Sequence, residues 1–244
     1  MTEPALSKQQ SKYSASGQSA LSLYKELVVG EDASWLSLAS YEMITAVGLL
    51  LPGLLGLGYR SLLYPQILKS SGRRPAIGRG VVLRRPSQIS FGQRVILDDY
   101  VALDVRGSDA AITLGDHVSI GRFSTLTAKD AKIDLAKAVN ISSHCRIASM
   151  SKVTIGESTL IAAFVYIGPG NHQHQAGKAM ITQDMEIKGG VEIGSHCWIG
   201  AHSTIMDGVT IGDGAIVGAN SFVRDSVPAR TIVAGSPAKI IREI

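Results

Sequence analysis

Branched aliphatic side chains recur every sixth residue through the C-terminal part of the chain. One unbroken run of this ladder is Ile193, Ile199, Ile205, Ile211, Val217 and Val223. Glycine directly follows four of these six residues, and small or branched residues stand two places before each of them. A period of six matches neither the 3.6-residue repeat of a helix nor the two-residue alternation of a long strand. It predicts short strands separated by tight turns.

The same ladder continues upstream in sets of three rungs, and its frame slips only between sets. The sets are Phe91, Leu97 and Leu103; Leu114, Ile120 and Leu126; Leu135, Ile141 and Ile147; and Ile155, Ile161 and Ile167. Three hexads make one turn of a three-sided prism, so every slip is expected at the same corner. The pattern predicts a mainly β fold, a parallel β-helix of six coils from about Ile89 to Val223 with one partial coil before them.

The largest slip follows Ile167 and inserts a loop over residues 168–188. This loop carries the run Asn171-His172-Gln173-His174. A long loop in an otherwise tight solenoid is a candidate functional element. The expected domains are therefore a β-helix over residues 73–226 with this loop, followed by a C-terminal tail over residues 227–244.

The N-terminal segment shows no hexad repeat. Residues 1–20 are rich in Ser, Gln and Lys and are expected to be flexible. Residues 21–72 are expected to form a helical apolar hairpin, because the uncharged run from Met43 to Tyr59 is broken in its middle by Pro52-Gly53. That run is at the short limit for a bilayer span. Two alternatives remain: a monotopic membrane contact through residues 43–64, or a hairpin packed on an oligomer.

Charge and composition sharpen this picture. Aromatic residues make up 5% of the chain and the net charge is +4, but six basic residues cluster directly after the hairpin. They are Lys69, Arg73, Arg74, Arg79, Arg84 and Arg85. Such a cluster suits an anionic lipid surface, nucleic acid, phosphate groups or plain solvent. With the flanking tyrosines it favours a cytoplasmic location at the inner face of the cell membrane, and no nucleic-acid partner is expected.

The two cysteines, Cys145 and Cys197, have no CxxC spacing. A disulfide framework and a structural zinc site are therefore not expected. Both stand two places before a rung, at the small inward position, so both are expected to pack in the core. No secretory signal is expected, because the first 42 residues are polar and mixed in charge.

Four features together resemble the hexapeptide-repeat O-acetyltransferases. They are the rungs, the histidine loop, the Cys197-Trp198-Ile199-Gly200 rung and the ending Ala234-Gly235-Ser236-Pro237-Ala238-Lys239. The resemblance covers about Ile77 to Ile244 and is strongest to the maltose, galactoside and surface-polysaccharide acetyltransferases. It implies a left-handed β-helix, a homotrimer with active sites between neighbouring subunits, and acetyl-CoA as the cosubstrate.

The resemblance places the catalytic histidine at His172, where a neutral imidazole would remove the proton of a sugar hydroxyl. His174 and His144 are possible acceptor-site residues. Asp184 and Glu186 are candidates for orienting His172, together with Glu157, and the residues alone do not choose among them. Without the repeat around it, His172 would read as an ordinary exposed loop histidine.

For coenzyme A, the resemblance points to the last coils. The residues that match cofactor-groove positions are Trp198, Gly218, Ala219, Lys239 and Arg242. Each also has a simpler reading as a surface or packing residue. No metal site is expected.

These residues predict an O-acetyltransferase that acts on a sugar or a lipid-linked glycan in surface-glycan biosynthesis. A nucleotide-sugar N-acyltransferase and a non-catalytic scaffold are the alternatives. A zinc carbonic anhydrase on the same scaffold would need three converging histidines. The remaining ones, His117, His144, His196 and His202, are scattered as expected for exposed turn residues.

Overall fold

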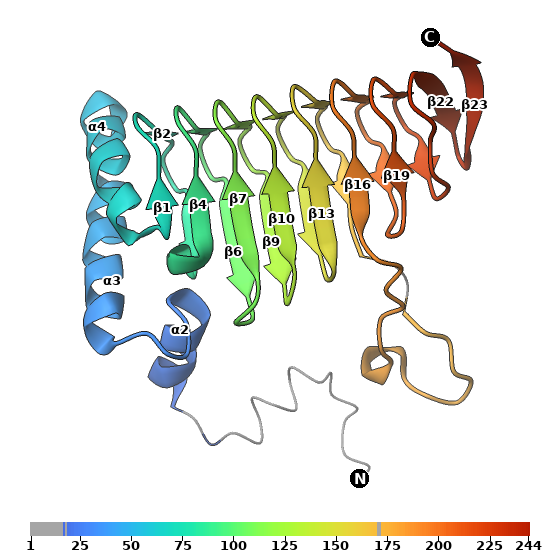
Figure 1. The fold of residues 1–244 in the computed structure, drawn as a ribbon. Coiled ribbons are helices and arrows are strands. Elements are labelled where there is room, and N and C mark those ends of the chain that lie inside the picture. The colour runs from blue at the N-terminus through green and yellow to red at the C-terminus, as the bar shows by residue number, and fades with distance from the viewer. Residues whose placement is uncertain (1–16, 18, 170–171) are drawn as a thin grey trace.

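The computed structural model describes residue 17 and residues 19–169 and 172–244. The expected flexible segment, residues 1–20, therefore falls almost wholly outside the described residues. Three sheets of short strands wind around a common axis into a triangular solenoid, and helices pack at its N-terminal end (Figure 1). The expected mainly β fold is confirmed.

Each side of the prism is one sheet. Sheet A consists of β1 (Ser70–Ser71), β4 (Ile89–Phe91), β7 (Ala111–Leu114), β10 (Lys132–Leu135), β13 (Lys152–Ile155), β16 (Val191–Ile193) and β19 (Thr210–Ile211). Sheet B consists of β2 (Ala76–Ile77), β5 (Ile96–Leu97), β8 (Ser119–Ile120), β11 (Asn140–Ile141), β14 (Leu160–Ile161), β17 (Trp198–Ile199), β20 (Ile216–Val217), β22 (Thr231–Gly235) and β23 (Ala238–Glu243). Sheet C consists of β3 (Val82–Arg84), β6 (Ala102–Arg106), β9 (Thr125–Lys129), β12 (Arg146–Ser149), β15 (Tyr166–Ile167), β18 (Thr204–Ile205) and β21 (Phe222–Val223).

The rungs of the ladder are direct partners between coils. On sheet C, for example, Leu103 pairs with Leu126 and Leu126 with Ile147. The turns from sheet A to sheet B (the A–B edge) and from sheet B to sheet C (the B–C edge) are four residues long in every coil. Every insertion therefore lies between sheet C and sheet A (the C–A edge), as the frame slips predict.

The expected partial first coil is wrong, because the structure has a complete one. It is formed by β1, β2 and β3 and begins at Ser70. Its first rung is Ser71, which pairs with Phe91. A serine in a rung position removes the aliphatic signal, which is why the hydrophobic pattern alone starts the solenoid too late.

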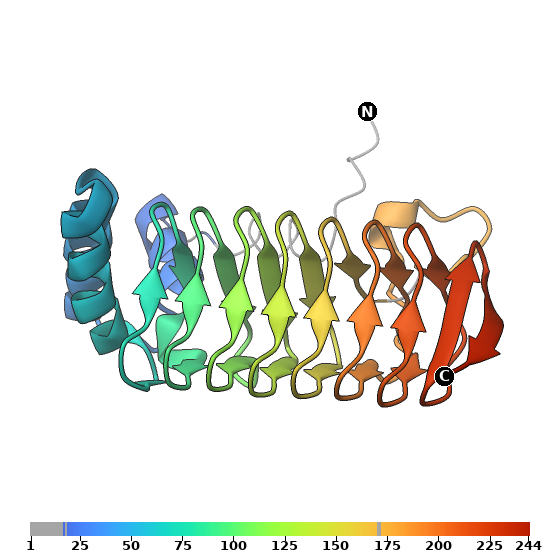
Figure 2. The ribbon, with the colours of Figure 1, turned by 90° about the horizontal axis from the view of Figure 1, so that it is seen from above.

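The coil is left-handed. In Figure 1 the strands of sheet A run upward on the near side, and successive coils advance from left to right. Seen from above in Figure 2, the strands of sheet B then run away from the viewer of Figure 1. This sense of rotation is opposite to the right-handed crossover usual between parallel strands.

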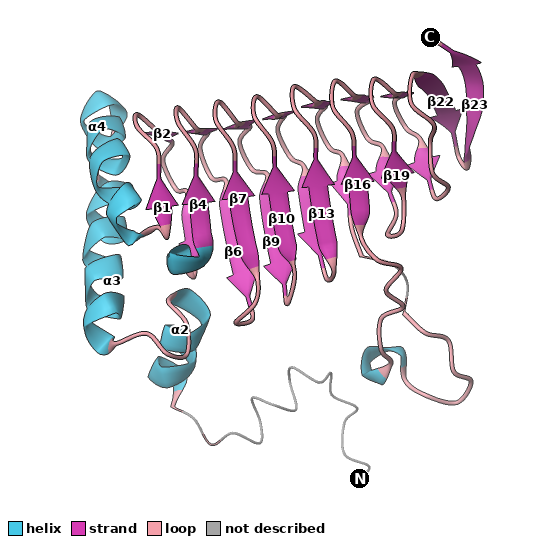
Figure 3. Ribbon diagram, viewed as in Figure 1, coloured by secondary structure: helices cyan, strands magenta, loops and turns pink. Residues whose placement is uncertain are grey.

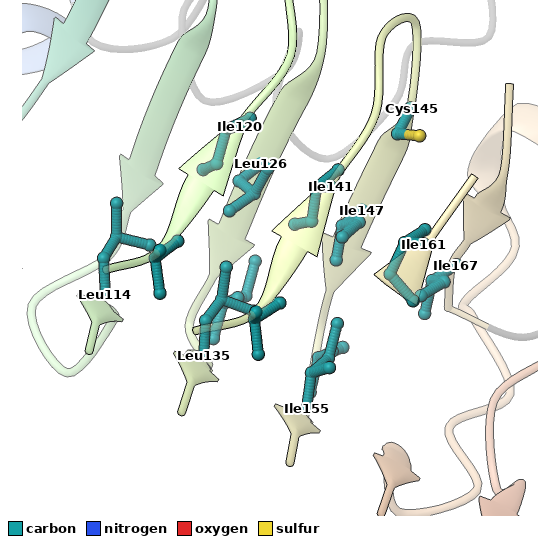
Figure 4. Close-up of a cluster of buried hydrophobic side chains, with 14 of the residues drawn as sticks. Leu114, Ile120, Leu126, Leu135, Ile141, Cys145, Ile147, Ile155, Ile161 and Ile167 are labelled. Carbon is teal, nitrogen blue, oxygen red and sulfur yellow. The ribbon is translucent and has the colours of Figure 1, made fainter. Parts of the chain in front are cut away.

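The prism is filled by the rungs themselves. Figure 4 shows the side chains of consecutive coils stacked in rows, and Ile120, Leu126 and Ile147 are completely buried. Burying a side chain of this size stabilises the fold by about 1.5–3 kcal/mol. Cys145 and Cys197 are buried beside these rows, as expected, and burial raises the pKa of both thiols.

Buried hydroxyls close the turns from inside. The Thr159 hydroxyl donates to the Gly194 carbonyl oxygen at 2.8 Å and accepts from the Cys197 amide at 3.1 Å. Ser124 does the same for its coil, donating to the Ser142 carbonyl and accepting from the Cys145 amide. These bonds satisfy turn amides and carbonyls that would otherwise be buried without partners.

The N-terminal segment forms α2 (Ala20–Val28), α3 (Trp35–Leu50), α4 (Gly53–Leu63) and the 3-10 helix η1 (Tyr64–Ile67) (Figures 1 and 3). The pattern over residues 20–42 reads as one helical stretch, but Gly30 at φ +110° breaks it and Ser34 caps the next helix. Helices α3 and α4 meet at Pro52, where the hairpin is expected to turn.

The hairpin packs on the N-terminal end of the solenoid. The key residue is Arg60, which is buried on α4. Its guanidinium donates to the Ile77 carbonyl in β2 and to the Gly48 carbonyl in α3, both at 2.8 Å. Within the described residues, none of the helices combines the length and the apolar character needed to cross a bilayer.

Two shorter features complete the fold. The 3-10 helices η2 (Pro86–Gln88) and η3 (Met180–Thr182) lie in insertions at the C–A edge. Residues 227–244 are expected as a tail, but most of them form a β-hairpin. Strand β22 extends sheet B in parallel, and β23 runs antiparallel to β22 at the edge of the sheet. The change of direction ends the parallel stacking at the C-terminal end of the solenoid.

Candidate active site

The loop over residues 168–190 projects from the C–A edge between β15 and β16 (Figure 1, lower right). Its two arms are joined by an antiparallel bridge between His172 and Met185. Next to that bridge, the Gln173 amide donates to the Asp184 carbonyl oxygen at 2.8 Å. His172 therefore sits on a paired segment of the loop rather than at its tip.

The His172 ring is oriented by a backbone carbonyl. Its Nδ1 lies 3.3 Å from the carbonyl oxygen of Gln183. A carbonyl oxygen only accepts, so this contact requires the proton on Nδ1. The neutral ring then has an unprotonated Nε2, which is the form that a general base needs. The sequence points to a carboxylate for the orienting role and offers no signal for a backbone carbonyl.

Gln183 also holds the loop together through its side chain. Its Oε1 accepts from the Gln175 amide at 2.7 Å, and its Nε2 donates to the Lys178 carbonyl at 3.1 Å. One amide thus cross-links the residues on both sides of the loop tip. Nothing in the sequence distinguishes this glutamine from a solvated one.

Asp207 anchors the returning arm of the loop. Its side chain is only 6% exposed, and its carboxylate accepts hydrogen bonds from the amides of Lys188 and Gly190. The next residue, Gly208, donates its amide to the Gly190 carbonyl at 2.7 Å. Asp207 is a further residue that the sequence analysis does not single out, although the Asp-Gly pair two residues after the rung Ile205 is a visible turn signal.

The other candidates for orienting His172 are placed differently. Asp184 and Glu186 are in the same loop with exposed side chains, as is His174. Asp184 meets the His172 arm through its backbone carbonyl. Glu157 lies on the A–B edge, where it pairs with Lys137 at 3.7 Å. The structure therefore brings Glu157 to a different edge of the prism from His172.

His144 belongs to a column of stacked rings on the B–C edge. The column consists of Tyr100, Phe123, His144, Phe164 and His202, one from each of five successive coils. Ring centroids are 5.3, 5.1, 4.8 and 4.7 Å apart in that order. His144 and His202 are thus packed against phenylalanine rings instead of projecting singly.

The coenzyme A candidates lie around the C-terminal coils, on sheet B, on its B–C edge and on the last strand, β23. Trp198 projects from the outer surface of sheet B and is 51% exposed. Gly218 and Ala219 are on the B–C edge, where a Cβ on Gly218 would lie 2.9 Å from the Ala234 Cβ. Lys239 and Arg242 are on β23, and Lys239 lines a pocket of about 170 Å³ together with Arg224. Trp198, Gly218 and Ala219 thus lie away from the C–A edge that carries the His172 loop, whereas Lys239 lies beside the C–A turn at residues 224–226.

Among the residues that the structure describes, no group of three or more histidine, cysteine or carboxylate side chains is placed to hold a metal ion. His117 and His196 lie on the A–B edge, whereas His144 and His202 lie on the B–C edge. The four scattered histidines therefore do not converge within the chain.

Comparisons with known proteins support the fold and the chemistry. The family model described as bacterial transferase hexapeptide (six repeats) matches residues 190–225. WbbJ of Escherichia coli strain K12, by name a putative lipopolysaccharide biosynthesis O-acetyl transferase, is 37% identical over 144 residues, which are 56% of this chain and 74% of WbbJ. The dTDP-4-amino-4,6-dideoxy-D-glucose acyltransferase of Escherichia coli is 30% identical over 159 residues, 63% of this chain and 81% of that enzyme.

Among solved structures, a point mutant of AntD, an N-acyltransferase from Bacillus cereus in complex with dTDP and coenzyme A, shares the fold. Its TM-score is 0.51 at 23% identity, and the match covers 74% of this chain and 87% of AntD. The hexad ladder, the left-handed solenoid and the identity to WbbJ agree with one another. This chain belongs to the hexapeptide-repeat transferase family and is an acyltransferase.

Proposed function

We propose that this acyltransferase moves an acetyl group from acetyl-CoA to a hydroxyl of a surface glycan, with His172 as the general base. The observation that carries the proposal is the contact of His172 Nδ1 with the Gln183 carbonyl, which leaves Nε2 ready to accept a proton. The similarity to WbbJ, by name a putative lipopolysaccharide biosynthesis O-acetyl transferase, supports the glycan hydroxyl as acceptor.

The chemistry is direct transfer. His172 Nε2 removes the hydroxyl proton as the oxygen attacks the thioester carbonyl. The tetrahedral intermediate then collapses and the carbon–sulfur bond breaks. The departing coenzyme A thiolate takes the proton from the His172 imidazolium. The described cysteines are buried thiols of raised pKa, which makes them poor nucleophiles and fits a route without an acyl-enzyme.

Replacing the base tests this proposal. We expect His172→Ala to lower kcat by about two to four orders of magnitude, the usual contribution of a positioned general base. His117→Ala, an exposed histidine on the A–B edge, is the control and should change kcat far less. Unchanged acetyl transfer by His172→Ala would refute the assignment.

Acetyl-CoA is proposed to lie along sheet B at the last coils. Trp198 offers an exposed ring there, and Gly218 and Ala219 place no bulky side chain at the start of the last B–C turn. Lys239 and Arg242 on β23 supply positive charge for the nucleotide phosphates. AntD, which shares the fold, was crystallised with coenzyme A, and this supports a coenzyme A thioester as donor.

We propose that the chain forms a homotrimer. His172 lies in the C–A loop, whereas Trp198, Gly218 and Ala219 lie on sheet B and its B–C edge, and we propose that a neighbouring subunit brings the two sets together. Sheet B and the B–C edge are the apolar sides: Ile96, Leu160 and Trp198 project outward with about half of their surface exposed. The corresponding outward positions on sheet A include Lys132 and Glu192.

Light scattering should give about three times the 25.8 kDa chain mass, the trimer mass implied by the resemblance. Leu160→Asp should shift the protein toward monomers, because it places a charge in the proposed contact. Thr210→Asp on the exposed outer surface of sheet A is the control. A monomeric but fully active wild type would contradict the trimer.

The second candidate is an N-acyltransferase acting on an amino sugar nucleotide. The 30% identity to the dTDP-4-amino-4,6-dideoxy-D-glucose acyltransferase favours it. The two products differ in chemistry: mild alkali cleaves an acetyl ester but leaves an amide intact. An alkali-stable acetyl group on the product would select the amine acceptor.

We also propose that the hairpin of α3 and α4 lies in the plane of a membrane, at the inner face of the cell membrane. One side of the hairpin packs on the solenoid through Arg60, while the leucines at its bend are exposed, with Leu54 at 86% and Leu55 at 78%. Clustered exposed leucines followed by basic residues are typical of interfacial helices. The residues concerned are 43–64, and this placement would put a lipid-linked acceptor within reach.

Vesicle sedimentation tests the membrane contact. The double variant Leu54→Glu with Leu55→Glu should lose at least about tenfold in binding to phosphatidylethanolamine–phosphatidylglycerol vesicles, since it buries two charges. The matched control changes Ile240 and Ile241 to Glu, an exposed apolar pair at the opposite end of the solenoid. Equal binding by both double variants would argue against the hairpin as the contact.

A further inference from the structure

A second concave surface lies at the same edge of the prism as the His172 loop. It is a cleft of about 1070 Å³ between the α2–α3 region and the C–A edge of the first coils. Its solenoid wall consists of the turns at residues 85–88, 105–108 and 129–130. Figures 1 and 2 both place α2 and the 168–190 loop on this one edge, toward opposite ends of the molecule.

Both walls of the cleft are held in place by polar side chains. Gln88 Nε2 donates to the carbonyls of Gly107, Ser108 and Ala110 at 3.0, 2.8 and 2.8 Å, which fixes the turn between β6 and β7. Lys25 Nζ donates to the Glu31 and Ala33 carbonyls at 2.8 and 2.6 Å, which fixes the link between α2 and α3. A preformed cleft loses less conformational entropy on binding than one that must close around its ligand.

The lining favours a neutral, polyhydroxylated ligand. The ionisable side chains almost cancel, with four carboxylates against three cations, so the cleft is not an anion site. They are Glu26, Glu31, Asp32 and Asp130, and Arg85, Arg106 and Lys129. Serine hydroxyls such as Ser40, Ser87 and Ser108 both donate and accept, and Leu27, Leu36 and Ile67 add apolar surface. Sugar hydroxyls donate and accept in the same way, while sugar C–H faces pack on apolar side chains.

The distance to the His172 loop suits an extended chain. Neighbouring strands are about 4.8 Å apart, so the turns at 107–108 and 130 lie about 10 to 14 Å along the axis from the base of the loop. We propose that this cleft binds the sugar units of an oligosaccharide acceptor that precede the unit being acetylated. The inference rests on the proposed glycan O-acetyl transfer and names its acceptor as an oligosaccharide chain.

A tryptophan in the cleft tests the inference. Ser40 on α3 is exposed and lines the cleft, whereas its neighbour Ala39 is equally exposed but does not. Ser40→Trp fills the cleft and Ala39→Trp is the matched control. The probes are gluco-, galacto- and manno-oligosaccharides of one to six units, with binding to the full-length protein followed by saturation-transfer NMR.

We expect binding to strengthen with chain length in the wild type and in Ala39→Trp, and to weaken about tenfold for the longer chains in Ser40→Trp. With any acceptor that is acetylated, Ser40→Trp should raise KM for long acceptors only and leave KM for acetyl-CoA unchanged. The inference would be overturned if binding did not depend on chain length, or if the two tryptophan variants behaved alike. A cleft filled by another subunit would give the second of these results. Binding is measured without turnover, so failure of the His172 assignment would be seen separately.

Discussion

The B–C edge and the C–A edge are built from the same coils, yet they differ in what they carry. On the B–C edge every turn has four residues, and the side chains at one position form the ring column from Tyr100 to His202. On the C–A edge the turns vary in length and carry the His172 loop and the wall of the cleft. A constant turn repeats one conformation and builds a ladder, whereas a variable turn can hold a site without disturbing the coils.

The ring column has a simple physical origin. In each four-residue turn the third residue takes a left-handed conformation, with φ of 60° at Tyr100 and 59° at His144. Its side chain therefore leaves the edge in the same direction in every coil. The spacing of neighbouring strands is about 4.8 Å, which is close to the separation at which aromatic rings stack favourably.

Deleting one residue from a B–C turn or from the C–A loop should give the largest difference in stability between the two edges. Removing Ala163 from a B–C turn should abolish folding, because a one-residue slip turns the following rungs outward. Removing Ala176 from the 168–190 loop should leave the melting temperature within about 4 °C, a change of about 1 kcal/mol. Circular dichroism and thermal melts measure both. A similar loss of folded structure in the two deletion variants would mean that the two edges do not differ in their tolerance of length changes.

The anchor of the loop gives the next largest effect. Asp207→Asn should lower kcat about 10- to 100-fold, since losing one hydrogen bond to a carboxylate costs about 1.5–3 kcal/mol. The shape of the pH–rate profile should persist, because His172 itself is unchanged, and KM for acetyl-CoA should stay constant. These readouts mark Asp207 as a positioning residue.

The control for that variant lies on the A–B edge. Asp213 also accepts a turn amide, from Ser195 at 2.7 Å, but it holds a four-residue turn. Asp213→Asn should therefore change kcat little. An equal loss of kcat in the two variants would show that general destabilisation, rather than loop placement, is responsible.

The ring column should contribute less. Phe164→Ala removes two ring contacts, with His144 and His202, whereas Tyr100→Ala removes one, with Phe123. Each contact is worth about 0.5–1.5 kcal/mol, so Phe164→Ala should lower the free energy of unfolding by about twice as much as Tyr100→Ala. Denaturant titration measures both values. The reverse order would indicate that the rings do not stabilise one another.

The smallest expected effect concerns the reactivity of the two buried thiols, which lie in four-residue turns of the B–C and A–B edges. Burial raises the pKa of Cys145 and Cys197, so the reactive thiolate is scarcer at any given pH than in an exposed cysteine. We expect iodoacetamide at pH 8 to leave both thiols unmodified in the native protein and to modify both after unfolding. Mass spectrometry counts the adducts. Rapid alkylation of either thiol in the folded protein would show that its turn opens to solvent.

Much of the fold is predictable because each coil repeats the same spacing of inward-facing aliphatic residues. Rungs such as Ile141 and Ile161 must face inward in every coil, so their spacing alone located the strands and the corner that accepts insertions. The first coil was underestimated because Ser71 occupies a rung without being aliphatic. The histidine loop was found as the longest frame slip, but Gln183 and Asp207 were not, because they act through backbone groups across the loop.

The sequence by itself determined the solenoid, the edge of the insertions and the loop that carries His172, because all three follow from the spacing of side chains along one chain. Only the tertiary structure decided which residues meet across coils. It brought Arg60 onto the Ile77 carbonyl, stacked His144 between Phe123 and Phe164, and opened the cleft beside Ser40. Such contacts depend on the directions in which distant backbone segments and side chains point, and a periodic hydrophobic pattern carries no information about those directions.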